Sequence, residues 1–285
     1  MDTIARNTFM VVKQKLQIIR SFYLPSLTRS IRTLPSFIIV GAQKGGTTSL
    51  NGYLKSHPDI CMARGKETWF FDKHYEKGIS YYRLHFPLKI SSFLNPRLVV
   101  GEASPSYIYN PRVPERIYTH FPNCKIIILL RDPIERAYSH YKHMRRIGFE
   151  DLATFESAIE KEAERTCGEL EKIMENGFYF SQSREFFSYL GKGIYYPQVK
   201  AYLDKFGKDR VLVVDSNSFF LSEKTIMSEI EKFIGVKPHN YQDFPVWNKG
   251  DKSRLPEATR NQLKDFYEPH NEMLFDLLGR KLSWA

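Results

Sequence analysis

Five short, mostly apolar runs recur along the chain. They cover residues 37–40, 59–62, 98–102, 124–130 and 210–214. Apolar runs of this length, bounded by turns, are typical of strands buried on both faces of a parallel sheet. The segments between them carry apolar residues at helical spacing. The pattern predicts an α/β fold: a three-layer sandwich with a central, mostly parallel sheet of about five strands and helices on both faces.

The first run leads into a glycine-rich turn, GAQKGG at residues 41–46, and then into a helix start rich in hydroxyl groups. Free backbone N–H groups and the positive end of a helix converge at such a point, which favours an anion. A nucleoside triphosphatase loop, GxxxxGK[ST], would have lysine at position 47, where this chain has Thr47. The lysine lies inside the loop instead, at Lys44. A tight glycine turn with a surface lysine is the alternative explanation.

A second anion motif follows the run at 124–130, which ends in Arg131-Asp-Pro. An arginine at the carboxyl end of a parallel strand lies where open α/β sheets bind ligands, and its forked donors suit phosphate. Ser139, two helical turns further on, can add a hydroxyl contact. A helix start with incidental charge is the alternative. Together the two motifs fit a ligand that carries a phosphate at each end.

Both motifs resemble those of sulfotransferases that use 3′-phosphoadenosine 5′-phosphosulfate (PAPS). VGAQKGGTTSL is similar to the 5′-phosphosulfate loop of the heparan-sulfate N- and 3-O-sulfotransferase branch, and RDPxxRxxS to the 3′-phosphate motif. The likeness spans about residues 36–284 and implies a P-loop-like sulfotransferase domain over 36–285. It implies PAPS as cofactor, adenosine 3′,5′-bisphosphate (PAP) as product, and no metal. The cofactor-binding residues that it implies are Lys44, Gly45, Gly46, Thr47, Thr48, Ser49, Arg131 and Ser139.

The segment KETWFFD at residues 66–72 is similar to a Lys-Glu-x-x-Phe-Phe-Asp segment of glycosaminoglycan sulfotransferases. By this resemblance Glu67 is the catalytic base that takes the proton of the acceptor, and Lys44 stabilises the leaving phosphate. The substrate-binding residues that the likeness implies are Lys66, Glu67, Phe71 and Tyr107. A hydrophobic anchor with solvated neighbours is the alternative interpretation.

Two regions match the family less well. Ala103 stands where the 3-O-sulfotransferases have a lysine, which weakens any inference of the same acceptor. Residues 247–254 resemble only loosely the basic loop that lies over the nucleotide. This loop supplies three further candidate phosphate contacts, Lys249, Gly250 and Arg254.

The charge is concentrated at the N-terminus. The chain has a net charge of +10, and residues 1–36 carry six basic residues against Asp2 alone. An apolar stripe at helical spacing, Val12, Leu16, Ile19 and Tyr23, accompanies them until Pro25. Residues 1–35 are therefore predicted to form a basic amphipathic arm that contacts an anionic membrane surface. A helix docked on the domain or on a neighbouring subunit is an equal alternative.

The composition also bears on location and partners. Three widely spaced cysteines favour a reducing compartment over a disulfide framework. No run reaches the roughly 20 apolar residues of a spanning helix, and no signal-peptide pattern opens the chain. We therefore expect a cytoplasmic protein, with membrane association through the arm. Nucleic acid is not an expected partner, because no recognised binding motif accompanies the basic residues. The sequence predicts nothing about oligomeric state.

The predicted function is transfer of a sulfuryl group from PAPS to a hydroxyl or amine, with a carbohydrate as the leading acceptor. A small-molecule, lipid or peptidyl-tyrosine acceptor stays open. The alternatives from other classes are a P-loop kinase or nucleotidase, and a protein that binds an adenosine bisphosphate without turnover. Residues 151–176, which are polar with a helical pattern, are expected either to set acceptor specificity or to form an insertion.

Overall fold

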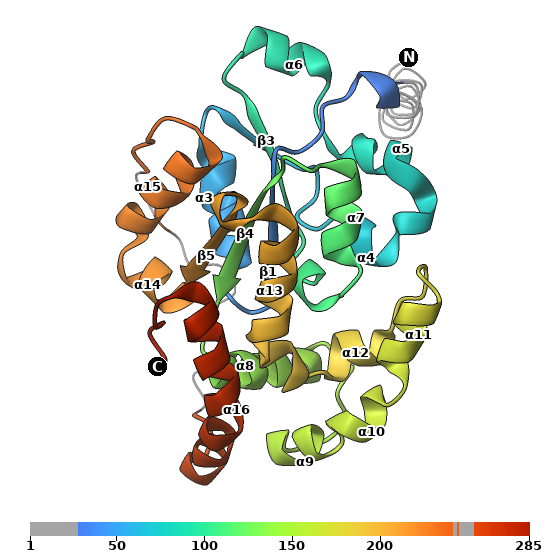
Figure 1. Ribbon diagram of the computed structural model, residues 1–285, viewed down its shortest axis with the longest axis vertical. Helices are drawn as coiled ribbons and strands as arrows, with labels where there is room; N and C mark the ends of the chain where they lie inside the picture. The colour runs from blue at the N-terminus through green and yellow to red at the C-terminus, as the bar shows by residue number, and fades with distance from the viewer. Residues whose placement is uncertain (1–27, 242–243, 245–253) are drawn as a thin grey trace, which may run out of the picture.

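A five-stranded sheet lies at the centre of the protein (Figure 1). The computed structural model describes residues 28–241, 244 and 254–285. The strand order is β2-β3-β1-β4-β5, and every neighbouring pair is parallel. The strands are β1 Phe37–Gly41, β2 Ile60–Met62, β3 Val99–Ala103, β4 Lys125–Leu130 and β5 Val211–Asp215. The predicted α/β fold is confirmed, and each strand lies within a residue of its predicted run.

Helices cover both faces of this sheet because successive strand residues point to opposite sides. Ile38 and Ile126 pack on one face, and Ile39 and Ile127 on the other. The helices on the first face are α4 Phe70–Lys73, α5 Gly78–Tyr82, α7 Val113–His120, α13 Tyr195–Phe206 and α16 Glu257–Leu278. Those on the second face are α3 Thr47–Ser56, α14 Ser216–Leu221 and α15 Glu223–Ile234. The sheet is thus the middle layer of the predicted sandwich.

A group of helices lies beyond the carboxyl end of the sheet. Helix α8 (Pro133–Arg146) follows β4 directly, and four short helices come after it in the chain. They are α9 Phe155–Glu160, α10 Glu162–Thr166, α11 Glu169–Glu175 and α12 Gln182–Phe187. Side chains of α8, α9 and α16 share a separate apolar cluster. The segment predicted as helical at 151–176 is therefore part of a set of short helices packed on α8. We call these helices, α9 to α12, the helical excursion.

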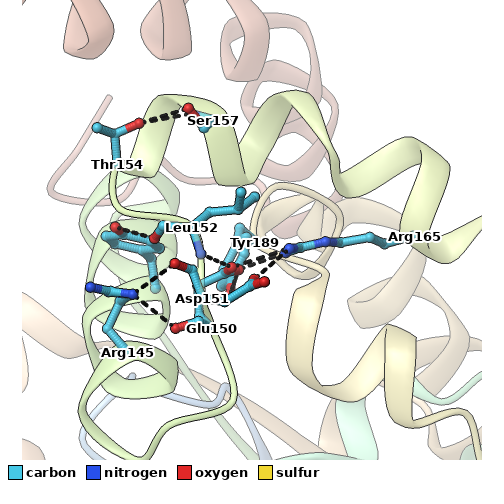
Figure 2. A network of polar contacts seen from close by, with 9 residues as sticks. Arg145, Glu150, Asp151, Leu152, Thr154, Ser157, Arg165 and Tyr189 are labelled. Atoms are coloured by element: carbon cyan, nitrogen blue, oxygen red, sulfur yellow. Dashed lines mark hydrogen bonds and ion pairs between the residues drawn. The ribbon is translucent and has the colours of Figure 1, made fainter.

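A buried carboxylate fastens this excursion to the end of α8, as Figure 2 shows. The Glu150 side chain has no exposed surface and accepts hydrogen bonds from Arg165 Nη1 and the Tyr189 hydroxyl, both at 2.7 Å. The backbone N–H of Leu152 donates to the same carboxylate at 2.9 Å. Burial alone would raise the pKa of Glu150, but these hydrogen bonds outweigh it and leave the pKa below its ordinary value.

The opposite end of the sheet carries the first described residues and helix α6 (Lys89–Leu94). Short 3₁₀ helices complete the fold: Arg29–Ile31, Tyr75–Lys77, Arg83–His85, Tyr107–Tyr109, Gly191–Gly193 and Lys208–Arg210. Residues 1–27 of the predicted arm lie outside the described residues, so its division from the domain stays a prediction. Within residues 28–241, 244 and 254–285, no helix is long and apolar enough to cross a membrane.

Candidate functional site

The glycine-rich loop after β1 is held tightly against the end of β4. The Ala42 backbone N–H donates to Leu129 O at 2.6 Å, and the Gly45 N–H donates to Ala42 O at 2.9 Å. A Cβ atom at Gly45 would lie 2.7 Å from Leu129 O, so only glycine fits there. Gly46, in the left-handed region with φ 95°, precedes α3 and provides no side-chain cap. The first N–H groups of α3 are thus offered to a ligand.

The second predicted motif meets this loop directly. Asp132 caps α8 by accepting a hydrogen bond from the Ile134 N–H at 2.9 Å. The preceding Arg131 donates from Nη1 to Lys44 O at 3.3 Å, and its guanidinium lies 3.6 Å from Glu135. Ser139 lies half-buried on the same helix. The structure therefore brings together two motifs that are far apart in sequence, at the carboxyl ends of neighbouring strands.

Positive charge accumulates around Lys44. Burial lowers the pKa of Lys44 to about 8, and the cations Arg146, Arg131 and Lys66 contribute to the shift. Burial likewise lowers the pKa of His143 to about 4, with Lys44 and Arg146 contributing. In a partly buried place, each positive charge disfavours the charged form of its neighbours. An anion bound among them would relieve that repulsion, so the region suits phosphate or sulfate groups.

Glu67 lies at the same edge of the sheet. Lys66 Nζ contacts Glu67 Oε1 at 2.8 Å, and both side chains are half-buried. The next residue, Thr68, anchors the segment: its N–H donates to Ser104 Oγ at 3.1 Å, and its hydroxyl donates to Glu102 at 2.6 Å. Because Glu102 and Ser104 lie at the carboxyl end of β3, the segment that carries Glu67 is fixed beside the glycine-rich loop.

Phe71 and Tyr107 do not line the site as predicted. Both are 0% exposed. The Tyr107 hydroxyl accepts hydrogen bonds from the N–H groups of Phe70 and Phe71, at 2.9 and 3.2 Å. The two rings pack edge to face, with centroids 5.6 Å apart. The prediction of direct substrate contact is wrong for these side chains in this structure, because they form the core under the Glu67 segment.

The remaining predicted residues differ in accessibility. Thr48 is half-buried, whereas Thr47 and Ser49 are 3% and 1% exposed. Arg254 is exposed just before α16. Lys249 and Gly250 lie outside the described residues. In the part of the chain that the structure describes, no group of three His, Cys, Asp or Glu residues could hold a metal ion.

Sequence reasoning missed a buried network behind the loop. Lys192 is 4% exposed, and its Nζ donates to Gln43 Oε1 at 3.0 Å and to Glu185 Oε2 at 2.9 Å. Gln43 Nε2 in turn donates to Glu185 Oε1 at 3.3 Å. With the fully buried Arg136, Gln43 and Lys192 line a small pocket that also includes Ser106. No local signal reveals this network, since its members come from distant segments of the chain.

Comparison with known proteins shows the family of the chain. The family model described as "Sulfotransferase domain" matches residues 34–266. The membrane-associated sulfotransferase kil1 of Dictyostelium discoideum is 28% identical, over 88% of this chain and 66% of that protein. Mouse heparan sulfate glucosamine 3-O-sulfotransferase 3A1 is 27% identical, over 90% of this chain and 66% of that protein. The chain thus spans about two thirds of the length of these relatives.

A solved structure is also similar. The crystal structure of a sulfotransferase from Alicyclobacillus acidocaldarius has 30% sequence identity and a TM-score of 0.67, and the match covers 88% of this chain and 98% of that one. The family match, over residues 34–266, covers most of the chain. The chain belongs to the sulfotransferase domain family.

Proposed function

We propose that the protein transfers a sulfuryl group from PAPS to a hydroxyl or amine of a carbohydrate. The observation that carries the proposal is the contact of Arg131 with the Lys44 loop, with Glu67 fixed at the same edge of the sheet. Two phosphate-binding motifs and a carboxylate at one edge suit a donor with two phosphates and an acceptor that must lose a proton. Relatives named heparan sulfate sulfotransferases support the choice of carbohydrate.

The residues present fit such a donor. The uncapped start of α3, Lys44 and the half-buried Thr48 would hold the 5′ end. Arg131 and Ser139 would hold the 3′-phosphate, and Arg254, with Lys249 and Gly250, would cover the nucleotide. When bound, PAPS supplies the sulfuryl group, and PAP is the product. The lowered pKa of Lys44 supports the fit, because it partly reflects cations that an anion would compensate.

The protein's own groups would then perform three tasks. Glu67 accepts the proton of the acceptor, and Lys66, 2.8 Å away, orients the carboxylate. The Lys44 ammonium and the loop N–H groups stabilise the charge that develops on the leaving phosphate. As in phosphoryl transfer, positioning and charge stabilisation supply most of the effect.

An aromatic surface beside Glu67 supports a ring-shaped, acidic acceptor. Trp69 is 38% exposed and adopts a left-handed backbone conformation with φ 48°. Lys73 Nζ lies 4.9 Å from the Trp69 ring and 4.5 Å from the Phe180 ring. A pyranose can pack on an aromatic face while the ammonium attracts its acidic substituent. We propose this surface as part of the acceptor site.

The cellular location is also a proposal. Cys61, Cys124 and Cys167 are all free thiols, which supports a reducing, cytoplasmic setting. Membrane contact through the basic residues 1–35 is proposed in addition, since one relative is named membrane-associated.

The decisive experiment is calorimetric titration with PAP and, in parallel, with ATP-Mg. We expect PAP to bind and Arg131→Ala to weaken it by at least about tenfold, since a charge-assisted contact is lost. Arg97→Ala removes the same charge at the other end of the sheet and should leave the affinity unchanged. Preference for ATP-Mg, or equal PAP affinity in Arg131→Ala, would overturn the proposal in favour of a kinase-like protein.

A further inference from the structure

Helix α6 exposes large apolar side chains. Ile90, Phe93 and Leu94 are 54%, 79% and 76% exposed, and none of the residues of α6 is buried. Their i, i+3 and i+4 spacing places them on one side of the helix. We call these three residues the α6 apolar face. Contiguous apolar surface of this kind marks an interaction site more often than isolated exposed residues do.

Basic groups lie at both ends of helix α6. Lys89 begins the helix, and the Arg97 side chain just after it is 65% exposed. The first described segment, with Arg29 exposed, is joined to the residues before α6 by the Thr33 N–H, which donates to Pro87 O at 2.9 Å. The described chain therefore begins close to α6, and the sequence before it, residues 1–27, contains four basic residues and one acidic residue.

The α6 apolar face lies at the opposite end of the sheet from the candidate site. Asn95 Nδ2 donates to Asp59 Oδ1 at 3.0 Å, which fixes the end of α6 to the residue before β2. Lys44, Glu67 and Arg131 all follow the carboxyl ends of strands. Figure 1 shows α6 and α8 at opposite ends of the sheet. A strand of five residues separates the two ends by roughly 17 Å.

We propose that the α6 apolar face docks on an anionic lipid surface, with Phe93 and Leu94 inserted and the flanking cations against the headgroups. An apolar face with a basic residue at each end of its helix is complementary to such a surface. A second copy of the chain would present the same positive charges and be repelled. Docking in this way turns the candidate site away from the membrane, toward an acceptor in solution.

The test is co-sedimentation of the full chain with phosphatidylcholine vesicles, with and without phosphatidylserine. We expect binding to the anionic vesicles only, weakened by salt. The variant Phe93→Ser/Leu94→Ser keeps the charge and should lose at least about tenfold in vesicle affinity. The matched control, Phe178→Ser/Leu221→Ser, removes two side chains that are 61% and 74% exposed elsewhere and should bind like the original protein.

Several results would overturn the proposal. Equal binding of the α6 variant and the original protein would assign membrane contact to other residues. Equal binding to neutral and anionic vesicles would remove the role of charge. Conversion of a dimer to a monomer by the α6 substitutions, measured by sedimentation equilibrium, would make the face an interface between copies. PAP affinity, which the proposed function predicts, is measured on every variant and should not change, so the two proposals fail separately.

Discussion

The lowered pKa of Lys44 predicts that binding of PAP takes up protons. Its ordinary value is 10.5 and its value in the free protein is about 8, lowered by burial and by neighbouring cations. This difference corresponds to about 3 kcal/mol against the charged form, an upper bound because the side chain still contacts water. A phosphate group bound at Lys44 favours the ammonium and raises the pKa again.

The extent of proton uptake on PAP binding follows from the Lys44 pKa of about 8. If the bound form stays protonated, binding takes up about half a proton at pH 8, where half of the free protein carries neutral Lys44. The affinity for PAP should fall about tenfold from pH 7 to pH 9. The sign for stability is opposite: the cost of charging Lys44 in the folded, free protein is fully present below about pH 8 and is relieved as the pH rises above it.

Calorimetry in two buffers of different ionisation enthalpy measures the proton uptake directly. Lys44→Gln is the matched variant: it should bind PAP more weakly at pH 7 and show no uptake between about pH 7 and pH 9. The PAP phosphates are already ionised in this range. An affinity that does not change with pH, or a pH dependence that survives Lys44→Gln, would refute the assignment of Lys44 to the phosphate site.

Three further outcomes are expected. Glu67→Gln should lower kcat by about 10²–10⁴-fold while PAP affinity, measured by calorimetry, stays unchanged. Trp69→Ala should raise the KM for the acceptor without changing PAP affinity. Trp69→Phe keeps an aromatic ring and should have a KM close to that of the original protein. Glu150→Ala should destabilise the fold by about 3 kcal/mol in urea unfolding, because Arg165 loses its buried partner. The stability that Glu150 contributes is present above its unfolded pKa and is lost as the pH falls through its lower folded value.

The sheet and the positions of the two motifs could be predicted because their signals are local. An apolar run followed by glycine or arginine predicts a strand. It also predicts that the glycine or arginine lies at the carboxyl end of the sheet. Neighbouring strands then bring Lys44 and Arg131 together, although the sequence separates them. Local signals are therefore sufficient to predict the position of a residue where the order of the strands alone decides it.

Burial of aromatic residues could not be predicted in the same way. The resemblance of residues 66–72 to glycosaminoglycan sulfotransferases implied that Phe71 contacts the substrate. In the structure, the Tyr107 hydroxyl satisfies the backbone N–H groups of Phe70 and Phe71, and the rings of Phe71 and Tyr107 enter the core. A sequence pattern does not show whether an aromatic ring faces a cleft or the layer beneath it, because both places favour the same residue types.

The network of Gln43, Glu185 and Lys192 gives the helical excursion a role beyond packing. A buried ion pair costs desolvation free energy, and an apolar pair of similar size would often be as stable. The location of this ion pair is therefore more informative than its strength. Lys192, which follows α12, holds the side chain of Gln43, the residue next to Lys44. Because Glu150 fastens the same excursion to α8, which begins beside Arg131, the excursion is tied to the segments that carry both anion motifs. Residues of these helices can thus fix the distance between the two proposed phosphate sites.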